Sequence, residues 1–306
     1  PRQGAFPRPP AGAAGLSVTG DPGMTGATGS TGARPGSAVT MDASAAVDEL
    51  SATGAVVFDG RGPLDGVLFD IDDTLVNTRA AFGAAMDGIA QVYLSHLPAD
   101  RLGEVLALWR RDPDGHYRAY TRGEISLEEQ RRLRANQLQT AFGADPLTED
   151  EFVAWDEVFE SSYRAGWVAH EDALETVAAV SGLGLRVGAL SNATTEHQLP
   201  KLEATGLGHV PMLVGLDTLG VGKPDPRVFL EACARLGTDP SRTLYVGDEL
   251  DLDARAAVRA GLYGAWLDRP GTRRGGVHQE DPAAASADGV VVLSGLDQLT
   301  GYLTEG

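Results

Sequence analysis

The chain has 306 residues, of which 42% are hydrophobic and 22% charged, and its formal net charge is −18. That length allows one large domain or two ordinary ones, and so acidic a surface repels nucleic acid and anionic membranes, so we expect neither as a partner. With a single cysteine, Cys233, and no run of 18 apolar residues, we predict a cytoplasmic protein, either a monomer or a homodimer.

Residues 1–60 are predicted to form a disordered N-terminal extension. Gly, Ala, Pro, Ser and Thr dominate residues 1–45, which contain almost no large apolar side chain. Such a segment buries too little apolar surface to offset the entropy lost on ordering.

Short apolar runs after residue 64 predict six strands. They are Val67–Phe69, Arg186–Leu190, Met212–Val214, Thr243–Val246, Tyr263–Leu267 and Val290–Leu293. Between the later runs lie helical stretches, and the clearest starts with Asp225 as N-cap and Pro226 at its first position and stops before Gly237. Strands separated by helices favour an α/β fold with a parallel sheet covered on both faces, which we assign to residues 61–78 and 183–306.

Residues 79–182 lack a convincing strand and are predicted to form an inserted all-α unit. Large apolar side chains recur there at helical spacing: Phe82, Met86, Ile89 and Tyr93. Two capping boxes precede further apolar stripes: Ser126 with Glu129, and Thr148 with Glu151. We expect three tryptophans, Trp109, Trp155 and Trp167, to build a small core within this unit.

Polar residues follow the predicted strands. Asp70 comes after "VLF", Ser191 after "RVGAL" and Asp248 after "TLYVG", while Lys223 lies in the glycine-rich "GVGKPDP" before a helix. Only two of the 25 basic residues are lysines, Lys201 and Lys223. Because ligands bind beyond the carboxyl ends of parallel strands, these groups are expected to converge. The compact ammonium of Lys223 suits a position between a phosphate oxygen and a carboxylate, which can share its charge.

Four motifs in this order resemble those of the haloacid dehalogenase-like (HAD) superfamily. They are "DIDDT" at 70–74, "LSN" at 190–192, "GKPDP" at 222–226 and "GDELDLD" at 247–253. The resemblance covers residues 64–304, and the helical insertion occupies the place of that family's C1 cap. It implies a Rossmann-like, doubly wound parallel sheet with an inserted all-α C1 cap.

The aspartate cluster indicates a metal. Crowded carboxylates raise one another's pKa unless a cation lies among them, and Mg²⁺ is a hard cation that prefers oxygen ligands. The resemblance implies that Asp70 and Asp248 supply carboxylates, that Asp72 supplies its backbone carbonyl, and that Asp253 binds directly or through water.

The resemblance also implies a phosphatase acting on a small soluble phosphorylated metabolite. Asp70 would attack the phosphorus to give an aspartyl-phosphate, and Asp72 would protonate the leaving alcohol and then activate water. This sequence of steps requires Asp70 to be ionised and Asp72 to be protonated at the start. Ser191 and Lys223 would bind phosphate oxygens, with Thr74 and Asn192 as further groups around the substrate. Dehalogenases lack an acid at the position of Asp72, since a halide needs no proton.

Other functions stay open. A phosphomutase of the same superfamily would share Asp72 and could use His96, His116 or His170 of the insertion as an acid or base. A phosphonatase would need a lysine in the insertion, which has none. A phosphoacceptor signalling domain uses similar groups, but there the lysine comes last, whereas Lys223 precedes Asp248. A binding-only relative would not need the complete set of catalytic groups.

The insertion is expected to select the substrate, because a cap closes over the leaving group. Arg118 and Arg122, with Tyr117, are the candidates for its inner face. Two departures from the family pattern concern the motifs themselves: Asp73 stands where many relatives have glycine, and Leu252 stands where asparagine is common, so that Asp251 could take over its hydrogen bond.

Overall fold

The computed structural model describes residues 55–273 and 280–305, so most of the predicted extension lies outside the described residues. Its end is corrected by strand β1 (Val56–Phe58), which falls within the range 1–60. β1 pairs in antiparallel fashion with β2 (Gly62–Pro63) and with β9 (Leu303–Glu305). Phe58 is fully buried, so the apolar side chains of β1 make residues 56–58 part of the folded core and not of the predicted extension.

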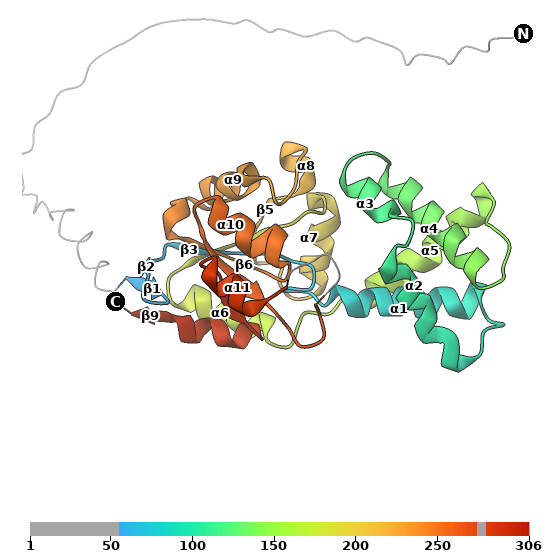
Figure 1. Cartoon of the computed structure of the whole chain (residues 1–306), viewed down its shortest axis with the longest axis horizontal. Helices are drawn as coiled ribbons and strands as arrows, with labels where there is room; N and C mark the ends of the chain where they lie inside the picture. Colours follow the sequence, from blue (N-terminus) through green and yellow to red (C-terminus); the bar gives the residue numbers. More distant parts are fainter. Residues whose placement is uncertain (1–54, 274–279, 306) are drawn as a thin grey trace, which may run out of the picture. The chain divides into compact units, whose positions relative to one another are not determined.

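The six predicted strands form one parallel sheet in the order β5-β4-β3-β6-β7-β8, which confirms the α/β class (Figure 1). Their bounds are β3 Gly66–Phe69, β4 Arg186–Leu190, β5 Met212–Val214, β6 Thr243–Gly247, β7 Tyr263–Leu267 and β8 Val291–Leu293. β3 is central, with β4 on one side and β6 on the other. The strand order changes direction at β3, and this is where an open α/β sheet binds its ligand.

Helices cover both faces of the sheet. They are α6 Ala173–Gly182, α7 Thr195–Ala204, α8 Leu216–Leu219, α9 Pro226–Leu236, α10 Arg255–Arg259 and α11 Pro282–Ala287. Short helical turns complete this part: η3 Pro240–Arg242, the π-helical η4 Leu250–Ala254 and η5 Leu296–Tyr302. Side chains of β3 alternate between the faces, since Val67 and Phe69 join one buried cluster and Leu68 another. As predicted, Asp225 caps α9 by accepting the Arg227 N–H at 2.9 Å, and Gly237 ends it at a φ of 75°.

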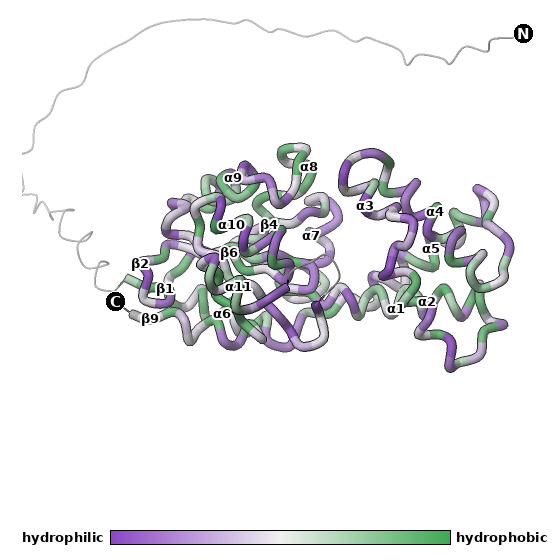
Figure 2. Tube along the Cα trace, viewed as in Figure 1, coloured by the Kyte–Doolittle hydropathy of each residue, from purple (hydrophilic) through white to green (hydrophobic). Residues whose placement is uncertain are grey.

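The insertion after β3 is helical and has a core of its own. It comprises α1 Thr78–Tyr93, η2 Ala99–Arg101, α2 Leu102–Arg111, α3 His116–Thr121, α4 Leu127–Ala141 and α5 Glu149–Ala165. Trp109 and Trp155 are buried and Trp167 packs against the same cluster, as the sequence predicted. The capping box of Thr148 and Glu151 is complete, and Ser126 caps α4 through the Glu129 N–H. Hydrophobic stretches, green in Figure 2, occur in both the sheet region and this insertion.

Helix α6 corrects the predicted end of the insertion at residue 182. Its buried residues Ala173, Val177 and Val180 belong to the cluster that contains Val67 and Phe69 of the sheet, so α6 is part of the α/β core. The chain returns to the core earlier, where the N–H of Asn77 donates to Val168 O and that of His170 to Leu75 O, each at 2.9 Å. Among the described residues, no helix combines the length and the apolar character needed to cross a bilayer.

Candidate active site

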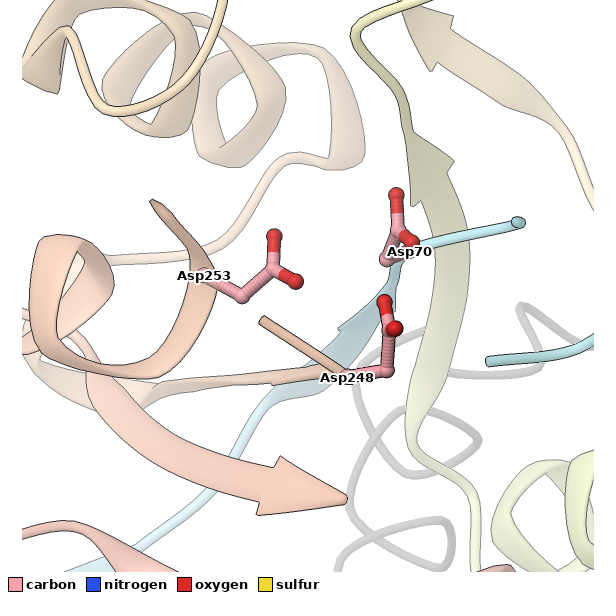
Figure 3. Close-up of side chains that lie close together, drawn as sticks. All are labelled: Asp70, Asp248 and Asp253. Atoms are coloured by element: carbon pink, nitrogen blue, oxygen red, sulfur yellow. The ribbon is translucent and has the colours of Figure 1, made fainter. Parts of the chain in front are cut away.

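Three aspartates meet at the carboxyl edge of the sheet, two of them directly after the neighbouring strands β3 and β6. Asp70 follows β3, Asp248 follows β6, and Asp253 lies in the π-helical turn η4. One carboxylate oxygen from each lies within 4.8 Å of the others, and Figure 3 shows the three side chains close together. A convergence of oxygen donors on this scale fits a small hard cation such as Mg²⁺.

Asp253 owes its place to local backbone geometry. Its Oδ2 accepts the Glu249 N–H at 2.9 Å, which holds the carboxylate at the start of the turn. A Cβ on residue 247 would clash with the Asp253 carboxyl group, so the glycine at the end of β6 lets this side chain approach the strand.

Lys223 reaches the same cluster from the loop before α9. Its buried Nζ donates to Asp70 Oδ1 and to Asp253 Oδ1, each at 2.6 Å, and to the Tyr245 hydroxyl at 2.9 Å. Burial alone would lower the pKa of Lys223, but Asp253 and Asp70 outweigh it and raise the pKa well above its usual value. Lys223 therefore remains a fixed positive charge beside the aspartate predicted to be the nucleophile.

The carboxylates around this lysine remain crowded. Burial, together with the charges of Asp253 and Asp72, raises the pKa of Asp70 to about 8 against the opposing charge of Lys223. Burial and the neighbouring Asp70 likewise raise the pKa of Asp248 well above its usual value. One ammonium among three carboxylates is too little positive charge, so these residues fit a divalent cation on electrostatic grounds as well.

Asp72 lies in a different environment, held by donors from three directions. Its Oδ1 accepts from Lys201 Nζ at 2.5 Å and from Thr78 Oγ1 at 2.7 Å, and its Oδ2 accepts from Gln198 Nε2 at 2.5 Å. Burial alone would raise the pKa of Asp72, but the charge and hydrogen bond of Lys201, with those of Thr78 and Gln198, lower it to about 2. The carboxylate of Asp72 points to these donors and is not part of the three-aspartate cluster.

The expected order of protonation, with Asp72 protonated and Asp70 ionised, is reversed in the metal-free protein. Asp70 lies among carboxylates with one shared cation, whereas Asp72 has Lys201 to itself. A cation bound among Asp70, Asp248 and Asp253 would favour ionised Asp70. A dianionic phosphate beside Asp72 would favour its protonated form by charge repulsion.

Ser191, Asn192 and Thr74 support the loops around the cluster. Ser191 is buried, and its Oγ accepts the Ala193 N–H at 3.1 Å and the Gln198 amide at 2.8 Å. Asn192 braces the lysine loop, accepting the Lys223 N–H at 2.6 Å and donating to Lys223 O at 3.0 Å. Thr74 Oγ1 makes a long contact of 3.5 Å with Asp70 Oδ2. The assignment of Thr74 and Asn192 to substrate binding thus stays a prediction. Their hydrogen bonds join them to Asp70 and to the loop of Lys223.

Asp73 adopts a left-handed backbone conformation with a φ of 59°. Glycine adopts this conformation more readily than residues with a Cβ. The aspartate also has a local role here, because its carboxylate accepts the Arg79 N–H at 2.9 Å and Arg79 Nε at 3.1 Å. Asp251, the suggested substitute for a missing hydrogen bond, instead forms an ion pair with Arg255 at 2.8 Å.

The residues proposed for substrate selection lie in the insertion. Arg118 and Arg122 are exposed on α3 and at its end, and Arg122 pairs with Glu124 at 2.5 Å. Of the candidate histidines, His96 contacts Phe142 O at 2.8 Å within the insertion, and His116 lies 3.8 Å from Asp114. Neither contact involves the aspartate cluster.

His170 lines a cavity of about 420 Å³ beside Asp73, together with Arg79, Arg110 and Arg269. Arg79 is paired with Asp73, and Arg269 forms two hydrogen bonds to Asp172 at 2.7 and 2.8 Å. This cavity places positive charge next to the loop that carries Asp70 and Asp72, in an otherwise acidic protein.

An α/β core with a helical insertion and this polar edge define a hydrolase of the haloacid dehalogenase type. The model of the haloacid dehalogenase-like hydrolase family matches residues 64–261. The chain therefore belongs to the haloacid dehalogenase-like hydrolases, and the insertion α1–α5 is its C1 cap.

Curated relatives support the assignment as a phosphoric monoester hydrolase. A glyceraldehyde 3-phosphate phosphatase from Methanopyrus kandleri is 30% identical over 202 residues, 65% of this chain and 82% of the relative. A phosphoglycolate phosphatase from Escherichia coli is 30% identical over 209 residues, 64% and 78% of the two chains. The magnesium-bound HAD-hydrolase YfnB from Bacillus subtilis has the same fold, with a TM-score of 0.60 at 19% identity over 78% of this chain and 97% of that one.

Proposed function

We propose that this enzyme is a Mg²⁺-dependent phosphatase that hydrolyses a small phosphorylated metabolite through an aspartyl-phosphate on Asp70. The observation that carries the proposal is the pair Asp70 and Asp72 on one loop, with a separate lysine assigned to each. A phosphatase needs both a nucleophile and a group that moves protons, and two aspartates in different environments can divide these tasks.

Asp70, Asp248 and Asp253 would hold the metal, with the Asp72 backbone carbonyl as a further ligand. When bound, Mg²⁺ supplies positive charge that favours ionised Asp70 and offsets the charge of the phosphate. Lys223 and Ser191 would bind the phosphate oxygens on which charge develops during transfer.

In the first step an Asp70 oxygen forms a bond to phosphorus while the ester P–O bond breaks, and Asp72 gives its proton to the leaving oxygen. In the second step the Asp72 carboxylate takes a proton from water as that water's oxygen attacks phosphorus. The bond between phosphorus and Asp70 breaks, which releases inorganic phosphate and restores the carboxylate.

The names of the relatives and the arginines near Asp73 both favour a small anionic substrate. Phosphoglycolate and glyceraldehyde 3-phosphate are the substrates named for the two relatives above. Arg79, Arg110 and Arg269 would favour an anionic group on the leaving side of the phosphate.

The test is phosphate release with Mg²⁺ from phosphoglycolate, glyceraldehyde 3-phosphate, a sugar phosphate and a nucleoside monophosphate. We expect wild-type turnover on at least one of them and a loss of at least ~10³-fold in Asp70→Asn, because the amide cannot act as the nucleophile. Asp65→Asn is the matched control, since Asp65 precedes β3 and pairs with Arg242 at 2.6 Å.

Absence of release from every substrate would contradict the proposal. If acetyl phosphate then left a stable phosphoryl group on the wild type, the phosphoacceptor signalling alternative would be favoured. Transfer of the phosphoryl group within a sugar phosphate, without net release, would favour the phosphomutase.

A further inference from the structure

We propose that Gln198 and Lys201 on α7 are positioning residues that fix both oxygens of the Asp72 carboxylate for its proton transfers. The inference rests on the proposed function, because it concerns the group that moves protons in it. Neither residue belongs to the four motifs, and neither was assigned a role from the sequence.

Each oxygen of the Asp72 carboxylate accepts a hydrogen bond from a different residue of helix α7. Gln198 and Lys201 are three residues apart, so they share a face of α7. Lys201 Nζ lies 2.5 Å from Asp72 Oδ1, and Gln198 Nε2 lies 2.5 Å from Asp72 Oδ2. With a separate donor on each oxygen, the carboxylate is held against rotation about its Cβ–Cγ bond.

The burial of these two side chains points to function. Lys201 is 1% exposed and Gln198 is fully buried, and Tyr163 of the cap covers Lys201 with its ring centre 5.8 Å from Nζ. Gln198 Oε1 is buried and has no hydrogen-bond partner among the described residues. Apolar residues of similar size are often as stable as a buried ion pair, so a buried lysine and a half-satisfied amide are poor choices for stability alone.

Gln198 also connects Asp72 to the phosphate-binding side of the site. The same Nε2 that donates to Asp72 donates to Ser191 Oγ at 2.8 Å. One amide group thereby sets the spacing between the carboxylate that moves protons and the hydroxyl proposed to bind the phosphate. Small errors in such a spacing reduce rates strongly, because proton transfer needs near-contact geometry.

The test compares two substrates by kcat/KM, which covers binding and the first transfer only. An alkyl phosphate that the wild type hydrolyses needs a proton on its leaving oxygen, whereas 4-nitrophenyl phosphate releases a stable phenolate without one. We expect Lys201→Met to lower kcat/KM for the alkyl phosphate about 100-fold and for 4-nitrophenyl phosphate by less than about threefold.

Further variants separate positioning from damage to the fold. Gln198→Leu keeps the ion pair between Lys201 and Asp72 and serves as the test if Lys201→Met does not fold. We expect it, too, to lower kcat/KM more for the alkyl phosphate than for 4-nitrophenyl phosphate, but with a smaller difference between the two substrates. Lys201→Arg keeps a donor and a charge and should regain part of the alkyl activity. Thr205→Val is the matched control, since Thr205 is the buried residue directly after α7 and its hydroxyl donates to Lys201 O at 2.8 Å, not to Asp72. It should leave the ratio of the two substrates unchanged.

If Lys201→Met and Gln198→Leu lower kcat/KM equally for both substrates, or for neither, the inference is overturned. Turnover by the wild type would still support the proposed phosphatase. A wild type inactive on every phosphomonoester would overturn the proposed function and this inference with it.

Discussion

Two aspartates on the loop after β3, Asp70 and Asp72, each pair with a buried lysine. The two lysines, Lys223 and Lys201, differ in the number of carboxylates around them. Lys223 is shared by Asp70 and Asp253, with Asp248 nearby, while Lys201 pairs with Asp72 and with no other carboxylate among the described residues. The first group has an excess of negative charge, and the pKa of Asp70 is raised; the second is balanced, and the pKa of Asp72 is lowered. The ratio of cations to carboxylates therefore makes the Asp70 group, and not the surroundings of Asp72, suited to a metal ion.

Lys223→Met should have the largest effect, because it removes the ammonium that Asp70 and Asp253 share on the crowded side, the group of Asp70, Asp248 and Asp253. We expect kcat to fall about 10³-fold through loss of a donor to the phosphate. We also expect the metal-free protein to lose about 3 kcal/mol of unfolding free energy, since the buried carboxylates lose their partner.

Denaturant unfolding with EDTA and with Mg²⁺ checks the stability of this variant. Mg²⁺ should restore part of the loss in Lys223→Met, because a cation among the aspartates replaces the missing charge. It should restore nothing in Lys201→Met, whose defect lies at Asp72. Equal recovery in both variants would remove the distinction between the two sides.

The pH dependence of Mg²⁺ binding tests the crowded side without a mutation. Because burial and the neighbouring carboxylates raise the pKa of Asp70 to about 8, we expect metal binding at pH 7 to displace a proton. Affinity should therefore rise with pH below pH 8, roughly tenfold per unit for each proton displaced, and Asp248, whose pKa is also raised, can release a second one. Calorimetry in buffers of different ionisation enthalpy measures the released proton directly; an affinity independent of pH from 6 to 8 would rule out this account.

The same raised pKa fixes the sign of a stability effect. The folded, metal-free protein retains a proton on Asp70 that the unfolded chain loses above about pH 4, so this group's contribution to stability falls as pH rises from about 4 to 8. Mg²⁺ should oppose that fall by stabilising the ionised carboxylate.

The smallest expected effect concerns Asp73, which lies on the same loop as Asp70 and Asp72. Asp73→Ala and Asp73→Gly both lose the hydrogen bonds to Arg79. Alanine has a Cβ, which is strained in the left-handed conformation of this residue, whereas glycine has none. Alanine should therefore be about 1 kcal/mol less stable than glycine in denaturant unfolding. Both variants should retain hydrolysis. Equal stabilities would indicate that the loop changes its backbone once the aspartate is gone.

The fold could be predicted from the sequence because its signals are local. Each apolar run produced a strand within one residue of its predicted limits, and Asp225 and Gly237 marked the ends of α9. Asp70 and Asp248 could be placed together because neighbouring parallel strands end at the same edge. The assignment of α6 to the cap was wrong because an amphipathic pattern shows that a helix is half-buried, without showing which core it covers.

The environment of Asp72 could not be predicted, since it depends on contacts 126 and 129 residues away in the chain. A signal was present: Lys201 is one of two lysines, and Gln198 lies three positions before it on the helix after "LSN". The protonation order was also beyond the sequence, because a pKa depends on the burial and charge that only folding creates.

The position of β3 affects how the chain folds as it is synthesised. β3 is the central strand, yet both of its partners, β4 and β6, come after the whole cap in the sequence. The cap helices contact one another within residues 78–165 and can pack before β4 and β6 are made, whereas β3 must wait for those later partners. During that interval the apolar face of β3 is without its sheet. The loop that carries Asp70 and Asp72 thus follows a strand that depends on completion of the later half of the chain.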